Sequence, residues 1–183
     1  MGFPKPLLRL GGETFLEHTA ASMLSAVDRL IVVVGAHRDA VTEVVPADSR
    51  INIAENPHYM RGQLSSIKAG LLAISHSAAA VVVHLVDHPT VLPATFRLLT
   101  EEYASSGKPI VLARFQGRRG HPVLFDRSIF NELQQLPGEV GARAVVNASP
   151  DRVAYVDVDD PGVLLDLDTP ADLARAGLPP IPH

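Results

Sequence analysis

The feature that most constrains the fold is an apolar, largely β-branched run, AVVVHLV, at residues 80–86. A run this apolar on both sides of the chain predicts a strand buried on both faces, which is typical of parallel sheets covered by helices. The shorter run RLIVVV at residues 29–34 ends at Gly35 and has the same character. We therefore expect an α/β protein.

Helical and extended patterns alternate along the rest of the chain. Apolar residues recur at helical spacing in residues 13–27, 39–45, 64–74, 93–104, 128–135 and 142–148. Further strands are expected at residues 51–54, 109–114, 123–125, 153–158 and 163–168, with a turn at 116–120 that makes a hairpin. Thr169 and Pro170 predict the start of a last helix. This order predicts a three-layer α/β/α sandwich with a mostly parallel sheet and a small hairpin.

Composition narrows the class of protein. The chain has 183 residues, 46% of them hydrophobic, which suits a single domain over residues 1–178 with a short tail at 179–183. A net charge of −4 gives no basic surface for nucleic acid or an anionic membrane. The apolar runs are far shorter than the roughly 20 residues that span a bilayer, and the first residues do not resemble a signal peptide. With no cysteine, the chain fits a cytoplasmic protein whose partners are small molecules or other proteins.

Acidic residues stand where two of the predicted strands end. Asp87 directly follows the run at 80–86, and Asp166 and Asp168 close the run at 163–168. Ligands of open α/β sheets bind outside the carboxyl ends of the strands. Alternation along a strand would put Asp166 and Asp168 on one face, so that with Asp87 they form a clamp for a divalent ion such as Mg²⁺. The alternative is that Asp87 caps a turn and that Asp168 only marks a helix start.

A zinc site at His84, Asp87 and His88 is a weaker hypothesis. On a strand, the two histidines would share a face but stand about 13 Å apart, and Asp87 would point the other way.

Two loops offer further candidates. The segment GRRGHP carries Arg118, Arg119 and His121, whose guanidinium groups suit phosphate or carboxylate. Its alternative is a solvated hairpin tip. The segment NPHYMRGQLSS places free N–H groups at an expected helix start, which favours anions, but its residues alone favour ordinary helix capping.

Several segments together resemble one family. PKPLLRLGGETFLEH, NPHYMRGQLSSIKAG, HLVDHP, GRRGHPVLF, LPGEVGARAVV and LLDLDTPADL, in this order, are similar to the molybdenum cofactor cytidylyltransferases and related nucleotidyltransferase-fold proteins. The resemblance implies a Rossmann-like domain that joins a nucleotide, usually CTP, to the phosphate of molybdopterin carrying molybdenum, with release of pyrophosphate. It also implies partners of three kinds: a nucleoside triphosphate, a molybdopterin-type molecule and a molybdoenzyme that receives the product.

The same resemblance implies roles for the candidates. Asp87 would hold Mg²⁺, with Asp166 or Asp168 as a second carboxylate, and Lys5 would lie against the triphosphate. Arg118, Arg119 and His121 would face the pterin. The nucleotide side would be lined by Asn56, Gly62, Ser65 and Ser66.

One departure from the family pattern stands out. Relatives open with a strand and a glycine-rich turn, L-A-A-G-x-S-x-R, before M-G-x-P-K, whereas this sequence starts at Met1-Gly2-Phe3-Pro4-Lys5. That strand is normally interior, so its absence predicts a slot with unpaired backbone groups on both neighbours. Either the start is assigned late, at an internal Met, or the chain is a truncated relative that binds cofactor without catalysis. A same-fold transferase with another phosphorylated acceptor is the remaining alternative.

Overall fold

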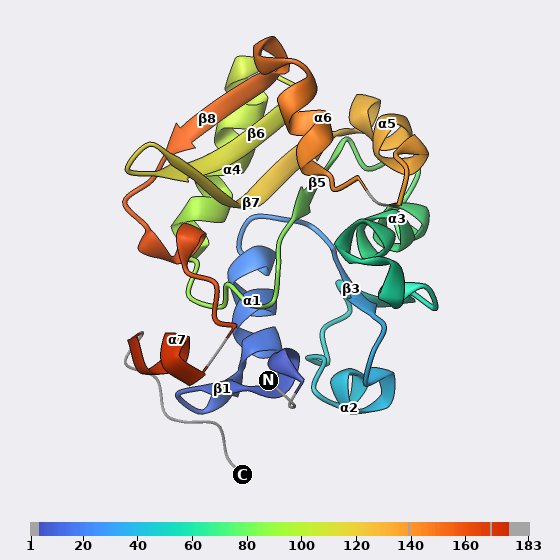
Figure 1. The fold of residues 1–183 in the computed structure, drawn as a ribbon, viewed down its shortest axis with the longest axis vertical. Helices are drawn as coiled ribbons and strands as arrows, with labels where there is room; N and C mark the ends of the chain where they lie inside the picture. The colour runs from blue at the N-terminus through green and yellow to red at the C-terminus, as the bar shows by residue number, and fades with distance from the viewer. Residues whose placement is uncertain (1–3, 139, 169, 176–183) are drawn as a thin grey trace.

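The fold is known from a computed structural model that describes residues 4–138, 140–168 and 170–175 (Figure 1). Short 3-10 helices (η) and strands at the start lead into α1 and a first βαβ unit, followed by α3 and the longer sheet strands. In chain order the elements are η1 Lys5–Leu7, β1 Arg9–Leu10, β2 Glu13–Thr14, α1 Phe15–Leu24, β3 Leu30–Val34, α2 Arg38–Glu43, β4 Ile51–Glu55, η2 Tyr59–Arg61, α3 Gln63–Ala73, β5 Ala80–Val83, α4 Pro93–Ser106, β6 Ile110–Phe115, β7 Arg118–Asp126, η3 Arg127–Ile129, α5 Phe130–Gln135, α6 Arg143–Ala148, η4 Pro150–Arg152, β8 Val153–Asp157, η5 Pro161–Leu164 and α7 Pro170–Arg175.

The strands form a mixed arrangement. The largest sheet has the order β5-β7-β6-β8, in which β6 runs parallel to β8 and β7 runs antiparallel to both β5 and β6. A second sheet pairs β3 with β4 in parallel, Leu30 opposite Ile51. The third pairs the two-residue strands β1 and β2. The sheets thus contain two parallel strand pairs, β3 with β4 and β6 with β8, and β6 and β7 make the predicted hairpin.

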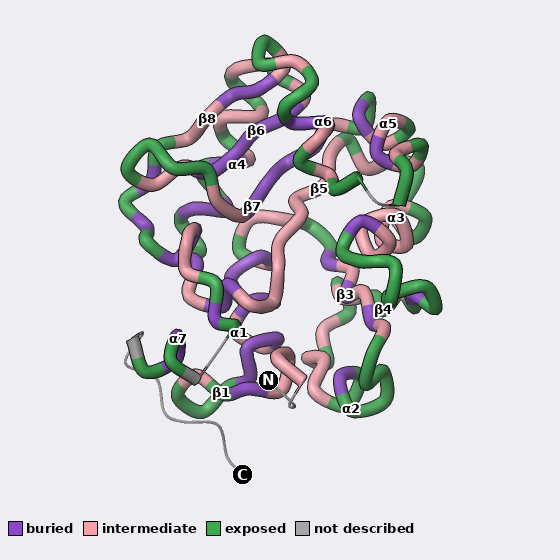
Figure 2. Tube along the Cα trace, in the orientation of Figure 1, coloured by how far each residue is buried: buried purple, intermediate pink, exposed green. Residues whose placement is uncertain are grey.

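Helices cover both faces of the large sheet, which confirms the three-layer α/β prediction. Along β6, Val111 and Ala113 pack toward Phe96 and Leu99 of α4, on the side where Figure 1 shows that helix. Ile110 and Leu112 point to the other face, where they join residues of α5 and α6. A strand that is apolar on both sides is therefore buried on both sides, as the purple trace of β6 in Figure 2 shows.

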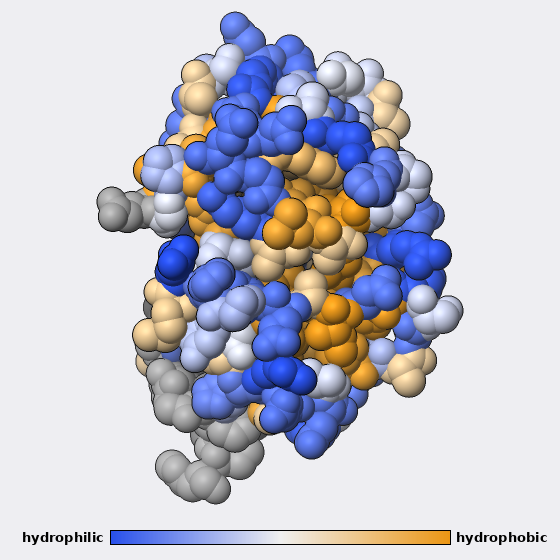
Figure 3. Space-filling model, turned by 90° about the vertical axis from the view of Figure 1, so that its right-hand side faces the viewer, coloured by the Kyte–Doolittle hydropathy of each residue, from blue (hydrophilic) through white to orange (hydrophobic). Residues whose placement is uncertain are grey.

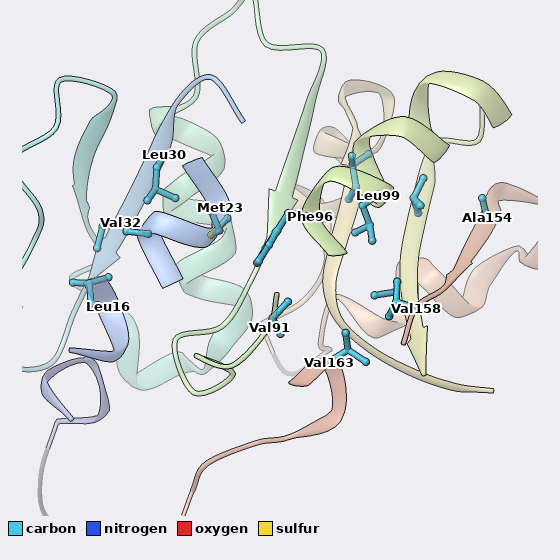
Figure 4. Packing of buried hydrophobic residues seen from close by; sticks show 14 of the residues in the cluster. Leu16, Met23, Leu30, Val32, Val91, Phe96, Leu99, Ala154, Val158 and Val163 are labelled. Atoms are coloured by element: carbon cyan, nitrogen blue, oxygen red, sulfur yellow. The ribbon is translucent and has the colours of Figure 1, made fainter. Parts of the chain in front are cut away.

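The two main sheets share one core although their strands do not pair. Within the described residues, β3 pairs only with β4, and β5 pairs only with β7. Figure 4 shows Leu30 and Val32 of β3 in the same hydrophobic cluster as Phe96 and Leu99, with β5 standing between the two groups. Among the described strands, β3 and β5 thus each have one edge without a strand partner.

The predicted strand at 80–86 is shorter than expected. β5 ends at Val83, which lies opposite Val123 in β7. The next residue of β7 in this register is Pro122, which has no N–H to donate, so the ladder stops there. His84 to Asp87 therefore leave the strand geometry on which the 13 Å separation of the two histidines was based, and that part of the prediction is wrong.

Two other expectations are corrected. Residues 163–168 form no strand: η5 covers Pro161–Leu164, and residues 165–168 are irregular. Asp160 caps η5 by accepting a hydrogen bond from the Gly162 N–H, and Pro161 occupies its first turn. The turn of the hairpin consists of Gln116 and Gly117 alone, both at positive φ, and residues 118–120 already belong to β7.

Most helices lie close to their predicted positions, and α4 begins at Pro93 as expected. The predicted cap Thr169 and the tail at 179–183 lie outside the described residues. None of the described helices is long and apolar enough to cross a membrane. Figure 3 shows hydrophobic residues reaching the surface in the middle of one face, and exposed apolar side chains in the chain include those of Met60 and Leu72.

Candidate functional site

Asp87 and Asp166 are brought together by a backbone contact. The Leu167 N–H donates to the Asp87 carbonyl over 3.0 Å. The Leu167 side chain is fully buried in a small cluster with Leu8, Phe15 and Leu173. Leu167 is buried, whereas the Asp166 and Asp168 side chains on either side of it are exposed. The predicted pairing of Asp166 with Asp168 is therefore found, although no strand produces it.

Lys5 lies among these three carboxylates. Its Nζ is 3.2 Å from Asp87 Oδ2 and 3.9 Å from Asp166 Oδ1, and it also forms an ion pair with Asp168. Burial of Leu8 and Phe15 against Leu167 holds the first turn of the chain in this place. We name the group of Lys5, Asp87, Asp166 and Asp168 the carboxylate corner. Three carboxylates and one ammonium group leave the corner with two negative charges.

One oxygen of the corner lacks a partner. Asp87 Oδ1 is buried and forms no hydrogen bond with any described residue, whereas Oδ2 faces Lys5. A buried carboxylate oxygen without a partner is costly unless something else binds it. Charge and geometry together therefore fit a divalent cation.

Three histidine rings adjoin the corner. The ring centroids of His84, His88 and His121 lie 5.4–6.5 Å apart, and Phe96 contacts His84 edge-on. Burial lowers the pKa of His84 to about 3 and that of His121 to about 4, with neighbouring histidines adding to both shifts. These two rings are neutral at ordinary pH. Of the three, His88 places a ring nitrogen within 4.8 Å of oxygens of both Asp87 and Asp166.

The candidate nucleotide-side residues form a compact hydrogen-bonded group. The Asn56 amide donates to the Ser65 and Ser66 hydroxyls over 2.8 and 3.0 Å, and its oxygen accepts from the His58 N–H. Gly62 precedes α3 at φ +90°, a conformation that glycine adopts readily. Asn56 and Ser65 also line a pocket of about 570 Å³ beside α3, together with Arg61 and Lys68. No described side chain caps the first turn of α3; Ser65 and Ser66 instead accept from Asn56, and the Ser65 hydroxyl donates to the His58 and Gly62 carbonyls.

The three candidate side chains of GRRGHP, those of Arg118, Arg119 and His121, do not point in one direction. Successive residues of β7 alternate, so Arg118 and Arg119 point to opposite faces. The Arg119 guanidinium donates to Asn147 Oδ1 over 2.9 Å and lies over the Tyr155 ring, while Arg118 is exposed. His121 instead faces the histidine rings beside the corner.

Two residues near the site were missed at the level of sequence. His88 was considered only for zinc, on the assumption that it continued a strand. Arg143, in α6, contributes a positive charge that lowers the pKa of His121, so it lies near that ring. In the sequence, His88 stands between Asp87 and Pro89, where a strand is expected to end, and this position could have indicated that it lies near the site.

Comparison with known proteins assigns the family. Residues 1–153 match the family described as the MobA-like NTP transferase domain. The chain belongs to this family of nucleotidyltransferases. Membership agrees with the Rossmann-like architecture and with a carboxylate corner beyond a strand end. Nucleotidyl transfer is thus the general activity of proteins with this domain.

Relatives of this MobA-like domain support the assignment over nearly its whole length. It is 27% identical over 176 residues to the molybdenum cofactor cytidylyltransferase of Escherichia coli K12, covering 96% of this chain and 88% of that one. The crystal structure of Rv0371c from Mycobacterium tuberculosis is 30% identical with a TM-score of 0.78, over 96% and 90% of the two chains. A manganese complex of Rv0371c is similar at 30% identity and a TM-score of 0.73, over 95% and 91%.

Proposed function

We propose that this transferase joins CMP, taken from CTP, to the phosphate of a molybdopterin-type cofactor and releases pyrophosphate. The similarity to the E. coli cytidylyltransferase supports the choice of nucleotide and acceptor. The observation that carries the proposal is the carboxylate corner, where Asp87 Oδ1 is buried with no hydrogen-bond partner among the described residues and lies beside two further carboxylates. A molybdoenzyme would receive the nucleotidylated cofactor.

The corner suits the divalent ion that such a reaction uses. Asp87, with Asp166 and Asp168, would hold Mg²⁺, and the manganese complex of Rv0371c supports a divalent ion in this family. When bound, the ion neutralises charge on the nucleotide phosphates. Two excess negative charges at the corner match a divalent cation.

The chain's own residues then orient the reactants. An ionised phosphate oxygen of the acceptor attacks the α-phosphorus, so no group has to remove a proton, and positioning with charge neutralisation is enough. His84 and His121 would be poor general bases in any case, because burial lowers their pKa values to about 3 and about 4 and so disfavours taking up a proton. Lys5, which pairs with the carboxylates of the corner, would neutralise charge on the triphosphate. Asn56, Gly62, Ser65 and Ser66 would line the nucleotide. His121 would face the acceptor, whereas Arg118 and Arg119 point to opposite faces of β7 and cannot both do so.

Pyrophosphate release tests this proposal. Wild-type protein incubated with CTP, molybdopterin and Mg²⁺ is expected to release pyrophosphate, and Asp87→Ala is expected to lower the rate by at least about 100-fold, which is roughly 2.7 kcal/mol of transition-state stabilisation. Asp39→Ala, at an exposed carboxylate in α2, is the matched control and should keep the wild-type rate. Binding of molybdopterin without pyrophosphate release by the wild type would instead assign a non-catalytic binding role. Release with another phosphorylated acceptor alone would replace the substrate.

A further inference from the structure

His88 adds a nitrogen atom to the carboxylate corner. It follows Asp87 directly and is only 7% exposed. One of its ring nitrogens lies within 4.8 Å of an oxygen of Asp87 and an oxygen of Asp166. Magnesium is bound in proteins mainly by oxygen atoms in a near-ideal octahedron. A buried imidazole at this place is therefore a donor that a magnesium site does not need.

Hydrogen bonding leaves one nitrogen of His88 free for an ion. Nδ1 lies 3.3 Å from the Gly162 carbonyl oxygen. A carbonyl oxygen only accepts, so Nδ1 carries the proton and Nε2 of the neutral ring carries the lone pair. In the part of the chain that the structure describes, the hydrogen bond of the His88 ring is the one made by Nδ1. Histidines that bind metals commonly donate their other N–H to a backbone carbonyl, which fixes the orientation of the ring.

A buried network holds the carbonyl that orients His88. Asp160 is 2% exposed and accepts from the Gly162 N–H over 2.9 Å. Its other oxygen accepts from the Leu92 N–H over 2.9 Å and from the Thr95 hydroxyl over 2.6 Å. These bonds tie η5 to the start of α4. The His84 ring also donates to the His88 carbonyl over 3.1 Å, so His88 is held at both its backbone and its ring.

We propose that His88 Nε2 is the third protein ligand of a divalent ion held by Asp87 and Asp166, and that it makes the site prefer transition-metal ions such as Mn²⁺ over Mg²⁺. First-row transition ions accept imidazole nitrogen, whereas Mg²⁺ gains little from it. The preorganised ring lowers the cost of forming the site. The proposal shares two carboxylates with the proposed function but requires neither CTP nor turnover.

Metal titration without nucleotide tests the preference. MnCl2 and MgCl2 are titrated separately into the wild type, His88→Gln and His76→Gln by calorimetry. We expect the wild type to bind Mn²⁺ at least about tenfold more tightly than Mg²⁺, and His88→Gln to lose at least about tenfold in Mn²⁺ affinity with less than about threefold change for Mg²⁺. His76→Gln removes an exposed histidine and should match the wild type. The proposal is overturned if His88→Gln loses affinity for both ions equally, or if it loses no affinity for Mn²⁺.

Pulsed electron paramagnetic resonance of bound Mn²⁺ gives a second readout, and its deciding measurement is made on the wild type. We expect coupling to one directly bound imidazole nitrogen in the wild type, and none in His88→Gln. Mn²⁺ bound without nitrogen coupling would refute the role of His88 and leave the proposed function standing. If the wild type binds neither ion, both the role of His88 as a metal ligand and the role of the carboxylate corner as a metal site are refuted.

Discussion

At the scale of single residues, the site combines an ionic corner with uncharged histidines. Lys5 contacts all three carboxylates of the corner, while desolvation keeps His84 and His121 neutral beside them. A buried ring that cannot take up a proton makes the folded state sensitive to acid, because the same ring in the unfolded chain titrates near 6.5.

The stability of the metal-free protein should therefore fall as the pH falls from about 6.5 toward 4. In this window the unfolded chain binds protons at His84 and His121 that the folded chain does not bind. Each of the two residues therefore lowers the free energy of unfolding by about 1.4 kcal/mol per pH unit, or by roughly 2 kcal/mol at pH 5. Above pH 6.5 both forms are neutral and the cost vanishes. Urea unfolding with a chelator, at pH 7 and pH 5, measures the difference.

His84→Gln keeps a donor for the His88 carbonyl, but the new side chain does not titrate. Between pH 7 and pH 5 its free energy of unfolding should therefore fall by about 2 kcal/mol less than that of the wild type. His76→Gln, at an exposed site, should behave as the wild type. If His84→Gln shows the full wild-type loss, the burial of that ring does not control the titration.

The acidic residues and Lys5 could be predicted from sequence, but their surroundings could not. Asp87, Asp166 and Asp168 stand where apolar runs end, which is a local signal. The proximity of His88 to Asp166 is set by a contact between segments about 80 residues apart, the bond from the Leu167 N–H to the Asp87 carbonyl. No local pattern encodes such a contact.

At the scale of elements, η5 is held against β7 by the absence of a side chain at Gly120. A Cβ built on Gly120 would lie 2.0 Å from the Val163 carbonyl oxygen and 2.7 Å from its carbon. This close approach brings η5, and with it the segment that carries Asp166, against β7 of the large sheet. The backbone of η5 has little room to retreat, because a Cβ built on Gly162 would lie 2.8 Å from the Thr90 carbonyl carbon and oxygen.

Gly120→Ala is thus expected to destabilise the fold by at least about 2 kcal/mol, since the added methyl group must displace backbone. Gly12→Ala is the matched control, because a Cβ at Gly12 meets nothing within 4 Å, and it should change stability by less than about 0.5 kcal/mol. Urea denaturation of both variants gives the comparison. Similar stabilities for the two would show that η5 does not pack against β7 in this way.

The order of elements could be predicted from apolar periodicity, whereas two strand ends could not. Periodicity does not register that β5 loses its ladder opposite Pro122, because that pairing is made by a residue far along the chain. The segment at 163–168 is apolar enough for a strand, but the Asp160 cap and Pro161 start a 3-10 helix instead. Signals at Asp160-Pro161-Gly162 were available in the sequence and outweighed the apolar run.

At the scale of the whole molecule, two sheets share a core without sharing a strand. Residues of β3 and β6 belong to one hydrophobic cluster with Phe96; Figure 4 labels Leu30 and Val32 of β3 and Phe96 of α4 in it. The carboxylate corner is formed by three parts of the chain. Lys5 comes from η1, Asp87 from the segment after β5, and Asp166 and Asp168 from the segment after η5.

The most direct measurement of the central claim follows the α-phosphorus itself. The wild type is incubated with CTP labelled at the α-phosphate, molybdopterin and a divalent ion, and the products are separated. We predict that the label moves to the cofactor in the wild type and in Asp39→Ala but not in Asp87→Ala. Label that stays in CTP with the wild type, or that moves equally well with Asp87→Ala, would contradict the account.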